Sequence, residues 1–252
     1  MLVSETKTTL ELYDAEGKKH IILREDIDTL TASNNSLMPV GFEKEIKPED
    51  MLNLLEALTQ RGKFLPLPLR KVATVVSTQG MFFSKQGQVE RLIFPDWKPK
   101  TFQGVPFQLV DPQGSRVPNV ILLHGPQGNT PPKMPKRVSL PCNSPAGAIH
   151  FLSGVSGWGF PFGTKGSVSM IVRLTYSDGK TEDHELKNGI HFADYIRRVD
   201  VPESKFAFKL RGQQIRYLSI HPKRKEMIKQ IDLIKGSDRS APIVMAVTVE
   251  TR

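Results

Sequence analysis

Short runs of alternating apolar and polar residues dominate the chain from about residue 70 onward, and Gly, Pro, Asn and Asp residues separate them. Such alternation is typical of strands, whose successive side chains point to opposite faces. The runs predict strands at 71–76, 91–94, 105–110, 117–123, 148–153, 168–176, 181–186, 206–210, 215–220, 228–234 and 243–249. Many short strands punctuated by turn residues predict a mainly β protein, built as a jelly-roll-like β-sandwich.

The clearest hairpin lies in the middle of this region. Every second residue from Val168 to Tyr176 is apolar, so these side chains share one face of a strand. Asp178-Gly179 then separates this run from the next one, 181–186. Asp-Gly between two such runs is a strong signal for a tight hairpin turn.

The first 62 residues follow a different pattern and predict a short α/β N-terminal piece. Runs 8–13 and 20–24 predict a hairpin with its turn around Glu16-Gly17. After Lys47-Pro48-Glu49-Asp50, apolar residues recur with helical spacing up to Leu58, which predicts one helix. The organisation we predict is therefore a hairpin-plus-helix segment over 1–62, a bridging β segment over 63–100 and a β-sandwich over 101–252.

Composition narrows the class of protein. The chain has 252 residues, of which 38% are hydrophobic, so it can bury a core. No apolar run approaches the roughly 20 residues that a membrane-spanning helix needs, and the first residues do not resemble a secretory signal. The only cysteine, Cys142, forbids an intrachain disulfide and predicts a structural role.

The net charge of +9 favours a polyanionic partner. However, the basic clusters are short, scattered and not interleaved with aromatic residues as in a base-stacking surface, so we predict a solvated surface and no nucleic-acid partner. The sequence also lacks the common catalytic signatures, such as Gly-x-Ser-x-Gly, His-Glu-x-x-His and a phosphate-binding glycine loop. These absences favour a protein without catalytic activity.

The most unusual segment is the glycine-rich stretch from Gly154 to Gly163, which contains Trp158, Phe160 and Phe162. Aromatic rings in a loop between strands can stack on the flat faces of sugars while polar neighbours bond the hydroxyl groups. The same rings could instead close one end of the sandwich core. The polar partners we expect at this edge are Asp178, His191, Asp194 and Tyr195.

Two stretches resemble known families. The hairpin, the segment Ser36-Leu37-Met38-Pro39-Val40-Gly41-Phe42-Glu43 and the helix to about Leu58 resemble the end of a c-type haem-binding domain of planctomycete multidomain proteins. The resemblance implies that Met38 is a haem axial ligand if the missing upstream haem segment is present. The Cys-x-x-Cys-His attachment motif is absent, so we expect no cofactor in this chain and haem c only in a longer parent protein. The resemblance also implies a periplasmic or extracellular location.

The remainder, about 70–250, looks like the tail that follows this haem domain, and its second half resembles galactose-binding-like jelly-roll modules. The matching segments are Phe102-Gln103-Gly104-Val105-Pro106-Phe107, Ile149-His150-Phe151-Leu152-Ser153-Gly154, Tyr176-Ser177-Asp178-Gly179-Lys180 and Ala241-Pro242-Ile243-Val244-Met245-Ala246-Val247-Thr248. The resemblance implies a non-catalytic module that binds or docks on polysaccharide. The alternatives are a structural or electron-transfer accessory domain packed on the upstream haem domain, and a polysaccharide-active enzyme. Structural calcium held by loop oxygens is compatible with such modules.

Overall fold

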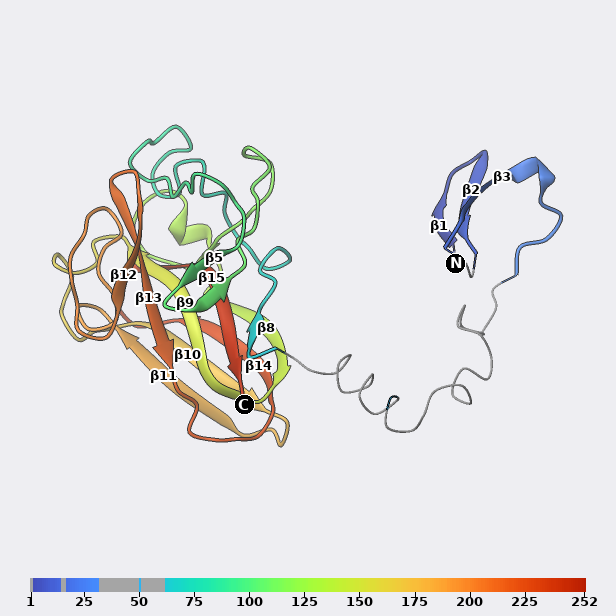
Figure 1. Cartoon of the computed structure of the whole chain (residues 1–252). Coiled ribbons are helices and arrows are strands. Elements are labelled where there is room, and N and C mark those ends of the chain that lie inside the picture. The colour runs from blue at the N-terminus through green and yellow to red at the C-terminus, as the bar shows by residue number, and fades with distance from the viewer. Residues whose placement is uncertain (1, 15–16, 32–49, 51–61) are drawn as a thin grey trace. The chain divides into compact units, whose positions relative to one another are not determined.

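The computed structural model describes residues 2–14, 17–31, 50 and 62–252 (Figure 1). The chain divides into two compact units, Met1–Gln60 and Arg61–Arg252. The predicted helix after residue 50 and the predicted haem ligand Met38 lie outside the described residues. Each unit is described by itself below.

The first unit contains a small antiparallel sheet in the order β1-β2-β3, formed by β1 (Leu2–Glu5), β2 (Thr9–Tyr13) and β3 (Lys19–Leu23). A short 3-10 helix, η1 (Arg24–Asp26), follows. Thr9 pairs with Leu23 and Tyr13 with Lys19, which confirms the predicted hairpin. The sequence pattern missed β1, whose four residues are too few to show an alternation.

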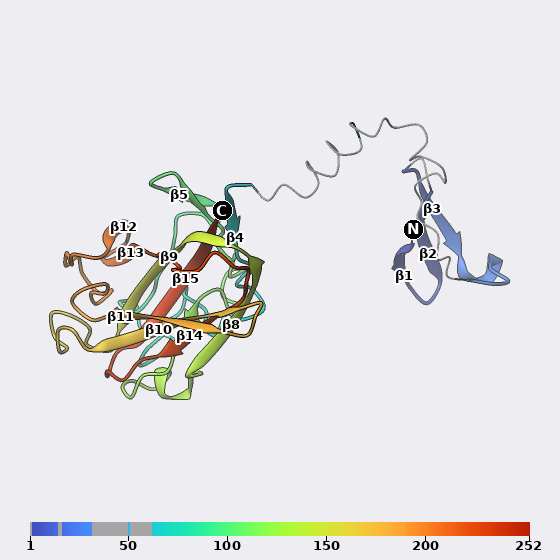
Figure 2. The ribbon, with the colours of Figure 1, turned by 90° about the horizontal axis from the view of Figure 1, so that it is seen from below.

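The second unit is built from two main antiparallel sheets (Figures 1 and 2). The six-stranded sheet has the order β12-β13-β9-β15-β4, and β7 also pairs with β15. The four-stranded sheet has the order β11-β10-β14-β8. The strands of the larger sheet are β4 (Phe64–Pro66), β7 (Ile121–Leu122), β9 (Ala146–Ser156), β12 (Lys205–Leu210), β13 (Gln213–Ile220) and β15 (Ala241–Thr251). Those of the smaller sheet are β8 (Arg137–Ser144), β10 (Val168–Tyr176), β11 (Thr181–Lys187) and β14 (Ile228–Lys235).

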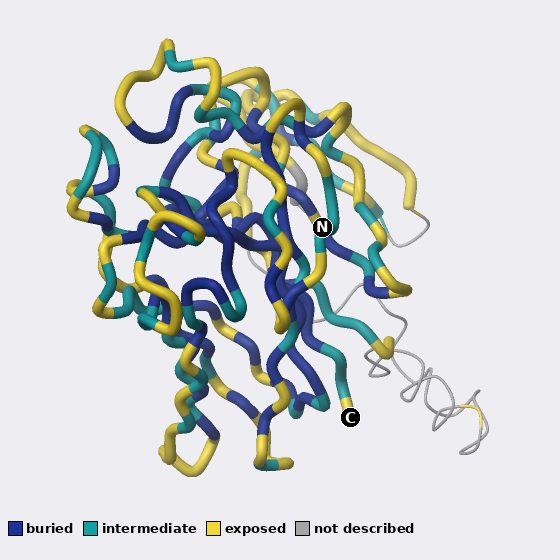
Figure 3. The backbone as a smooth tube through the Cα atoms, turned by 90° about the vertical axis from the view of Figure 1, so that its left-hand side faces the viewer, coloured by how far each residue is buried: buried dark blue, intermediate teal, exposed yellow. Residues whose placement is uncertain are grey.

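Two apolar cores lie on opposite faces of the six-stranded sheet. One core lies between the two sheets and contains Phe151 from β9 and Val172 from β10. The other contains Leu152 from β9 and is covered by the segment before β7, which contributes Met81 and Phe94. The central strands β9 and β15 are therefore buried on both faces, while exposed backbone gathers in the loops (Figure 3). The mainly β sandwich predicted from the sequence is confirmed, and its jelly-roll topology stays a prediction.

Two predicted strands are wrong. Residues 71–76 form only an isolated bridge, Val75 with Val120, and residues 91–94 form no strand. Val75 and Leu92 are both buried in the core on the outer face of the large sheet, so each segment carries apolar residues without forming a strand. Burial alone, without strand pairing, was enough to produce the pattern.

The sequence pattern missed β8, although its residues alternate strictly between exposed and buried. Pro141 lies within this strand, and a proline argues against a central strand because it donates no hydrogen bond to a neighbour. β8 is the edge strand of the four-stranded sheet and pairs only with β14, so proline is tolerated there. A separate two-stranded hairpin is formed by β5 (Lys100–Phe102) and β6 (Val105–Phe107), and a 3-10 turn, η2 (Pro131–Lys133), precedes β8.

Candidate functional site

Strand register gathers three loops at one end of the sandwich, which we call the aromatic end. The loops are 157–167 after β9, 188–197 after β11 and 236–240 after β14. Ser156 at the end of β9 pairs with Ala241, the first residue of β15. Val168 at the start of β10 pairs with Lys187, the last residue of β11. In an antiparallel sheet, one strand ends beside the residue at which its neighbour begins. The three loops that follow these strand ends therefore meet there.

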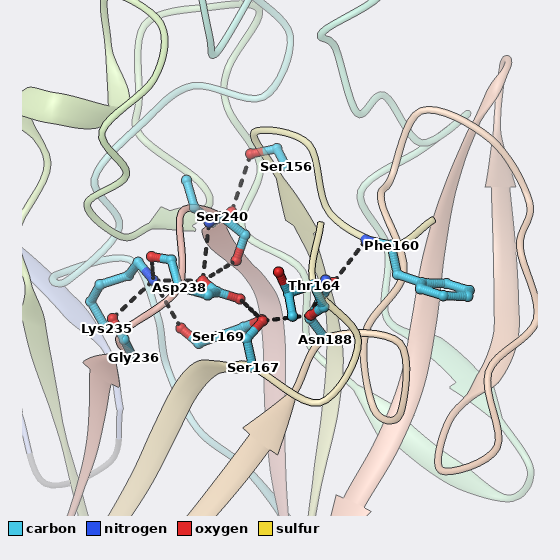
Figure 4. Close-up of polar contacts among 11 residues, drawn as sticks. Ser156, Phe160, Thr164, Ser167, Ser169, Asn188, Lys235, Gly236, Asp238 and Ser240 are labelled. Carbon is cyan, nitrogen blue, oxygen red and sulfur yellow. Dashed lines mark hydrogen bonds and ion pairs between the residues drawn. The ribbon is translucent and has the colours of Figure 1, made fainter. Parts of the chain in front are cut away.

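The aromatic loop is fixed in place by Asn188, which is buried just after β11. Its side-chain oxygen accepts a hydrogen bond from the backbone N–H of Phe160 at 2.7 Å. Its side-chain nitrogen donates to the carbonyl of Thr164 at 3.1 Å. Figure 4 shows these contacts. One amide thus bonds two turns of the loop, so the loop has a defined conformation before any ligand arrives.

Asp194 holds the same loop from a second side. Its carboxylate accepts the backbone N–H groups of Gly159 at 2.8 Å and Ile196 at 3.1 Å. The side chain is buried, and this burial raises the pKa of the carboxyl group. We expected Asp194 to bond sugar hydroxyls, but its oxygens are occupied by backbone donors. Asp194 positions the loop instead.

Two of the three aromatic rings in this loop are exposed. Trp158 is 56% exposed and Phe162 is 52% exposed. Their ring centroids lie 5.6 Å apart with the planes at 89°, an arrangement that aromatic quadrupoles favour. Arg197 extends the group, because its guanidinium lies 5.0 Å from the centre of the Phe162 ring. Trp158 has a positive φ of 67°, which turns the chain sharply at the tip.

Phe160, the third ring, packs against the neighbouring loop. A Cβ atom added to Gly189 would lie 2.7 Å from the Phe160 ring. Phe160 is only partly exposed and lines neither of the two pockets described next. Phe160 therefore packs within the loop cluster, and it belongs to neither of the two apolar cores.

Trp158 and Phe162 form the wall between two pockets. A polar pocket of about 300 Å³ lies on one side and an apolar pocket of about 200 Å³ on the other. The polar pocket is lined in addition by Gln127, Gly157, Gly163, Thr164, Ser167, Asn188, Asp238, Arg239 and Ser240. The apolar pocket is lined in addition by Phe82, Phe83, Val89, Glu90, Gly157, Asp194, Tyr195 and Ile196. The aromatic pair thus offers flat apolar surface next to several hydrogen-bonding groups.

A buried ion pair forms the base of the polar pocket. The Nζ atom of Lys235 lies 2.8 Å from Oδ1 of Asp238, and the two side chains are only 6% and 8% exposed. Ser240 donates its hydroxyl to the same oxygen at 2.7 Å, and Ser169 donates to Oδ2 at 2.5 Å (Figure 4). Burial lowers the pKa of the Lys235 amine, and the Asp238 carboxylate opposes this shift. The pair fixes the 236–240 loop, which carries Arg239 and Ser240 to the pocket.

The structure does not bring His191 or the Tyr195 side chain to the polar pocket. Nδ1 of His191 accepts the backbone N–H of Lys187 at 3.1 Å, and burial lowers the pKa of this imidazole. Tyr195 belongs to the outer core and is 2% exposed, and burial raises the pKa of its phenol. Both residues therefore support the loop rather than offering polar groups to a ligand.

Asp178 lies at the opposite end of the sandwich. The nine residues of β10 separate it from the aromatic loop, a length of about 26 Å at roughly 3.3 Å per residue. Its carboxylate bonds Arg224 at 2.7 Å. The expected partnership of Asp178 with the aromatic residues is therefore corrected, because strand length places them at different ends.

Most polar residues of the pocket carry no signal of a site in the sequence. Asp238 and Ser240 lie in Gly236-Ser237-Asp238-Arg239-Ser240, a stretch of turn residues between two predicted strands. An Asp whose carboxylate accepts the N–H two residues later, here at 3.0 Å, is a common turn motif. That motif signals a turn, but only the strand register shows which other loops it meets.

Candidate ligands of a metal ion are not clustered in the residues that the structure describes. Covalent c-type haem uses two cysteines, whereas this chain has only Cys142, which is buried in β8. No group of three or more His, Cys, Asp or Glu side chains in the described ranges lies close enough to hold a metal ion. Within the same ranges, no helix is long and apolar enough to cross a membrane.

Comparison of the chain with family models, curated proteins and solved structures finds no match. The fold and the aromatic end define a β-sandwich with a preformed surface site. Its function is argued below from that geometry.

Proposed function

We propose that Arg61–Arg252 is a non-catalytic module that binds carbohydrate at the aromatic end. The observation that carries this proposal is the exposed pair of Trp158 and Phe162 beside a pocket of hydroxyl, amide and carboxylate groups. Sugars present apolar C–H faces and many hydroxyl groups, so a binding site needs both kinds of surface together.

The rigidity of the loop supports the proposal. Asn188 and Asp194 bond the loop backbone at several points, so the exposed rings are held in place without a ligand. A preorganised site loses little conformational entropy on binding. In this proposal Trp158 and Phe162 stack on sugar rings, while Ser240, Thr164 and Gln127 face their hydroxyl groups.

The carboxylates near the rings support the non-catalytic part of the proposal. Hydrolysis of a glycosidic bond ordinarily needs two carboxyl groups facing the substrate. Asp238 is bonded to Lys235 and three serines, and Asp194 is bonded to the loop backbone. Both groups act in holding the site together.

A second candidate function is the binding of a protein partner, such as the upstream haem domain that the sequence resemblance implies. It is favoured by three further exposed apolar residues around the apolar pocket, namely Phe83, Val89 and Ile196. Clusters of exposed apolar side chains often mark interaction surfaces. In this case Trp158 would contact the protein partner, and no polysaccharide would bind at Trp158.

Affinity electrophoresis through gels containing neutral or acidic polysaccharides separates the two functions. We expect at least one polysaccharide to retard the wild-type chain, and Trp158→Ala to abolish the retardation. Met227→Ala is the matched control, because Met227 is 46% exposed and lies beside the Asp178 turn, where its carbonyl accepts the Ser177 N–H. Retardation that survives in Trp158→Ala, or is absent with every polysaccharide, contradicts the proposal.

A further inference from the structure

The charged groups around the two pockets are of two kinds. Three carboxylates line the pockets, and each is occupied by donors of the protein. Asp238 bonds Lys235, and Asp194 accepts the backbone of Gly159 and Ile196. Glu90 accepts the N–H groups of Phe82 at 2.7 Å and Phe83 at 3.0 Å. None of these negative charges is directed at a ligand.

Lys235 is paired with Asp238, whereas three exposed cations at the aromatic end lack such partners. Arg239 lines the polar pocket, Arg197 lies over the Phe162 ring, and Lys165 projects from the aromatic loop itself. All three are exposed, and within the described part of the chain none has a carboxylate within ion-pair distance. Their guanidinium and ammonium groups remain available to an anion from outside.

Exposed cations without a carboxylate partner in the described residues also occur elsewhere on the sandwich, as Arg70 and Lys229 show, so the lack of a partner alone does not mark a site. What sets Arg197 and Arg239 apart is their position, because Arg197 lies over the exposed Phe162 ring and Arg239 lines the polar pocket. Near the rings, the polar groups consist of neutral hydroxyls and amides together with unpaired cations. An aromatic platform with cations at its rim matches a sugar that carries carboxylate or sulfate groups, because guanidinium binds both in a bidentate manner.

We infer that the ligand of the aromatic end is an acidic polysaccharide, with Arg197 and Arg239 bonding its carboxylate or sulfate groups. This inference rests on the carbohydrate-binding function proposed above and adds the chemical class of the sugar. Trp158 and Phe162 supply stacking that is common to neutral and acidic polymers, and the two arginines supply the preference for the acidic one.

Titration calorimetry at about 150 mM salt, where charge attraction over long distances is screened, tests the inference with two matched pairs of polymers. These are polygalacturonate against its methyl ester, and dextran sulfate against dextran. We expect the wild-type chain to bind one acidic polymer at least tenfold more tightly than its neutral partner. The double variant Arg197→Gln/Arg239→Gln should lose this preference, while Trp158→Ala should lose at least tenfold in affinity for whichever polymer is bound.

The matched control is Arg70→Gln/Lys229→Gln, which removes the same charge from two exposed residues outside the aromatic-end loops. It should keep the preference. Equal wild-type affinity for both members of each pair overturns the inference and leaves the carbohydrate-binding function standing. Loss of the preference in the control also overturns it, because the attraction would then come from overall charge. No binding of any polymer, or binding that Trp158→Ala leaves unchanged, overturns the proposed function and the inference together.

Discussion

The end of the sandwich that carries Asp178 and the aromatic end contain the same kinds of side chain in different states. At the Asp178 end, Arg224 bonds Asp178 at 2.7 Å and Glu226 at 3.0 Å, and its guanidinium lies 4.5 Å from the centre of the Tyr176 ring. Tyr176 in turn donates its hydroxyl to Glu182 at 2.5 Å. Each aromatic and charged side chain named here contacts another of them.

At the aromatic end, by contrast, the carboxylates are occupied, while two of the rings and the cations Arg197 and Arg239 are exposed. Trp158 and Phe162 are more than half exposed, and the Arg197 guanidinium lies over the Phe162 ring with no carboxylate within ion-pair distance in the described residues. The comparison teaches that residue type alone does not mark a site in this protein. A candidate site appears where the fold uses its own donors and acceptors to hold a loop and leaves the rest unsatisfied.

The largest expected effect is a loss of stability when the buried ion pair between Lys235 and Asp238 is broken. Lys235→Met leaves the Asp238 carboxylate, only 8% exposed, without its counterion. Removing one partner of a buried pair typically costs about 3–5 kcal/mol of unfolding free energy, which urea denaturation followed by fluorescence measures. As a control, Lys63→Met breaks the exposed pair with Glu250 and should cost less than about 1 kcal/mol. Equal losses in the two variants would show that the pocket base is not built on this pair.

A smaller loss is expected for the residue that fixes the aromatic loop. Asn188→Ala removes both the acceptor for Phe160 N–H and the donor to Thr164. Unsatisfied buried groups cost about 1–3 kcal/mol each, so we expect a loss of about 2–3 kcal/mol together with weaker polysaccharide binding. Asn129→Ala, which removes an exposed hydrogen bond to the Phe83 carbonyl, is the matched control. Wild-type stability and binding in Asn188→Ala would mean that the loop needs no such support.

The smallest effect is a dependence of stability on pH. Burial lowers the pKa values of His150, His184 and His191 from the ordinary value of 6.5. Below pH 6.5 the unfolded chain therefore binds more protons than the folded one, so the unfolding free energy falls as the pH falls and is flat above that value.

Urea denaturation between about pH 5 and 7.5 measures this slope. Near His191, Glu203 raises the pKa and Lys187 lowers it, but burial has the largest effect. His191→Gln should therefore reduce the slope without removing it. An unchanged slope in this variant would show that the imidazole is solvated equally in the folded and unfolded chain.

The strand pattern was sufficient to predict the fold class and most strands, because alternation reflects burial of one face of a sheet. The hairpin from Val168 to Leu186 follows from the pattern and the Asp-Gly turn, and the register confirms it. The pattern predicted a strand at 91–94, where the residues are buried without pairing to a neighbouring strand. It missed β8, because this edge strand contains Pro141.

The site could be predicted only in part. A glycine-rich loop with three aromatics identified the segment, but not that Phe160 packs against Gly189 while Trp158 and Phe162 are exposed. Residue type alone groups Asp178 with the loop, whereas the length of β10 places it at the other end of the sandwich. Asp238 lines the polar pocket because of the register of β14 against β10, and no local sequence pattern encodes that register.

Protection of Trp158 from quenching tests the central claim most directly. The chain has two tryptophans, so Trp97→Phe leaves Trp158 as the only source of tryptophan emission. Acrylamide quenching of this variant is measured with and without the polysaccharide that binds most tightly. We predict that a saturating amount lowers the quenching constant of Trp158 several-fold and that Arg224→Gln, in the same background, leaves this protection intact. Quenching that is unchanged while the polysaccharide is bound would place the ligand elsewhere and contradict the account.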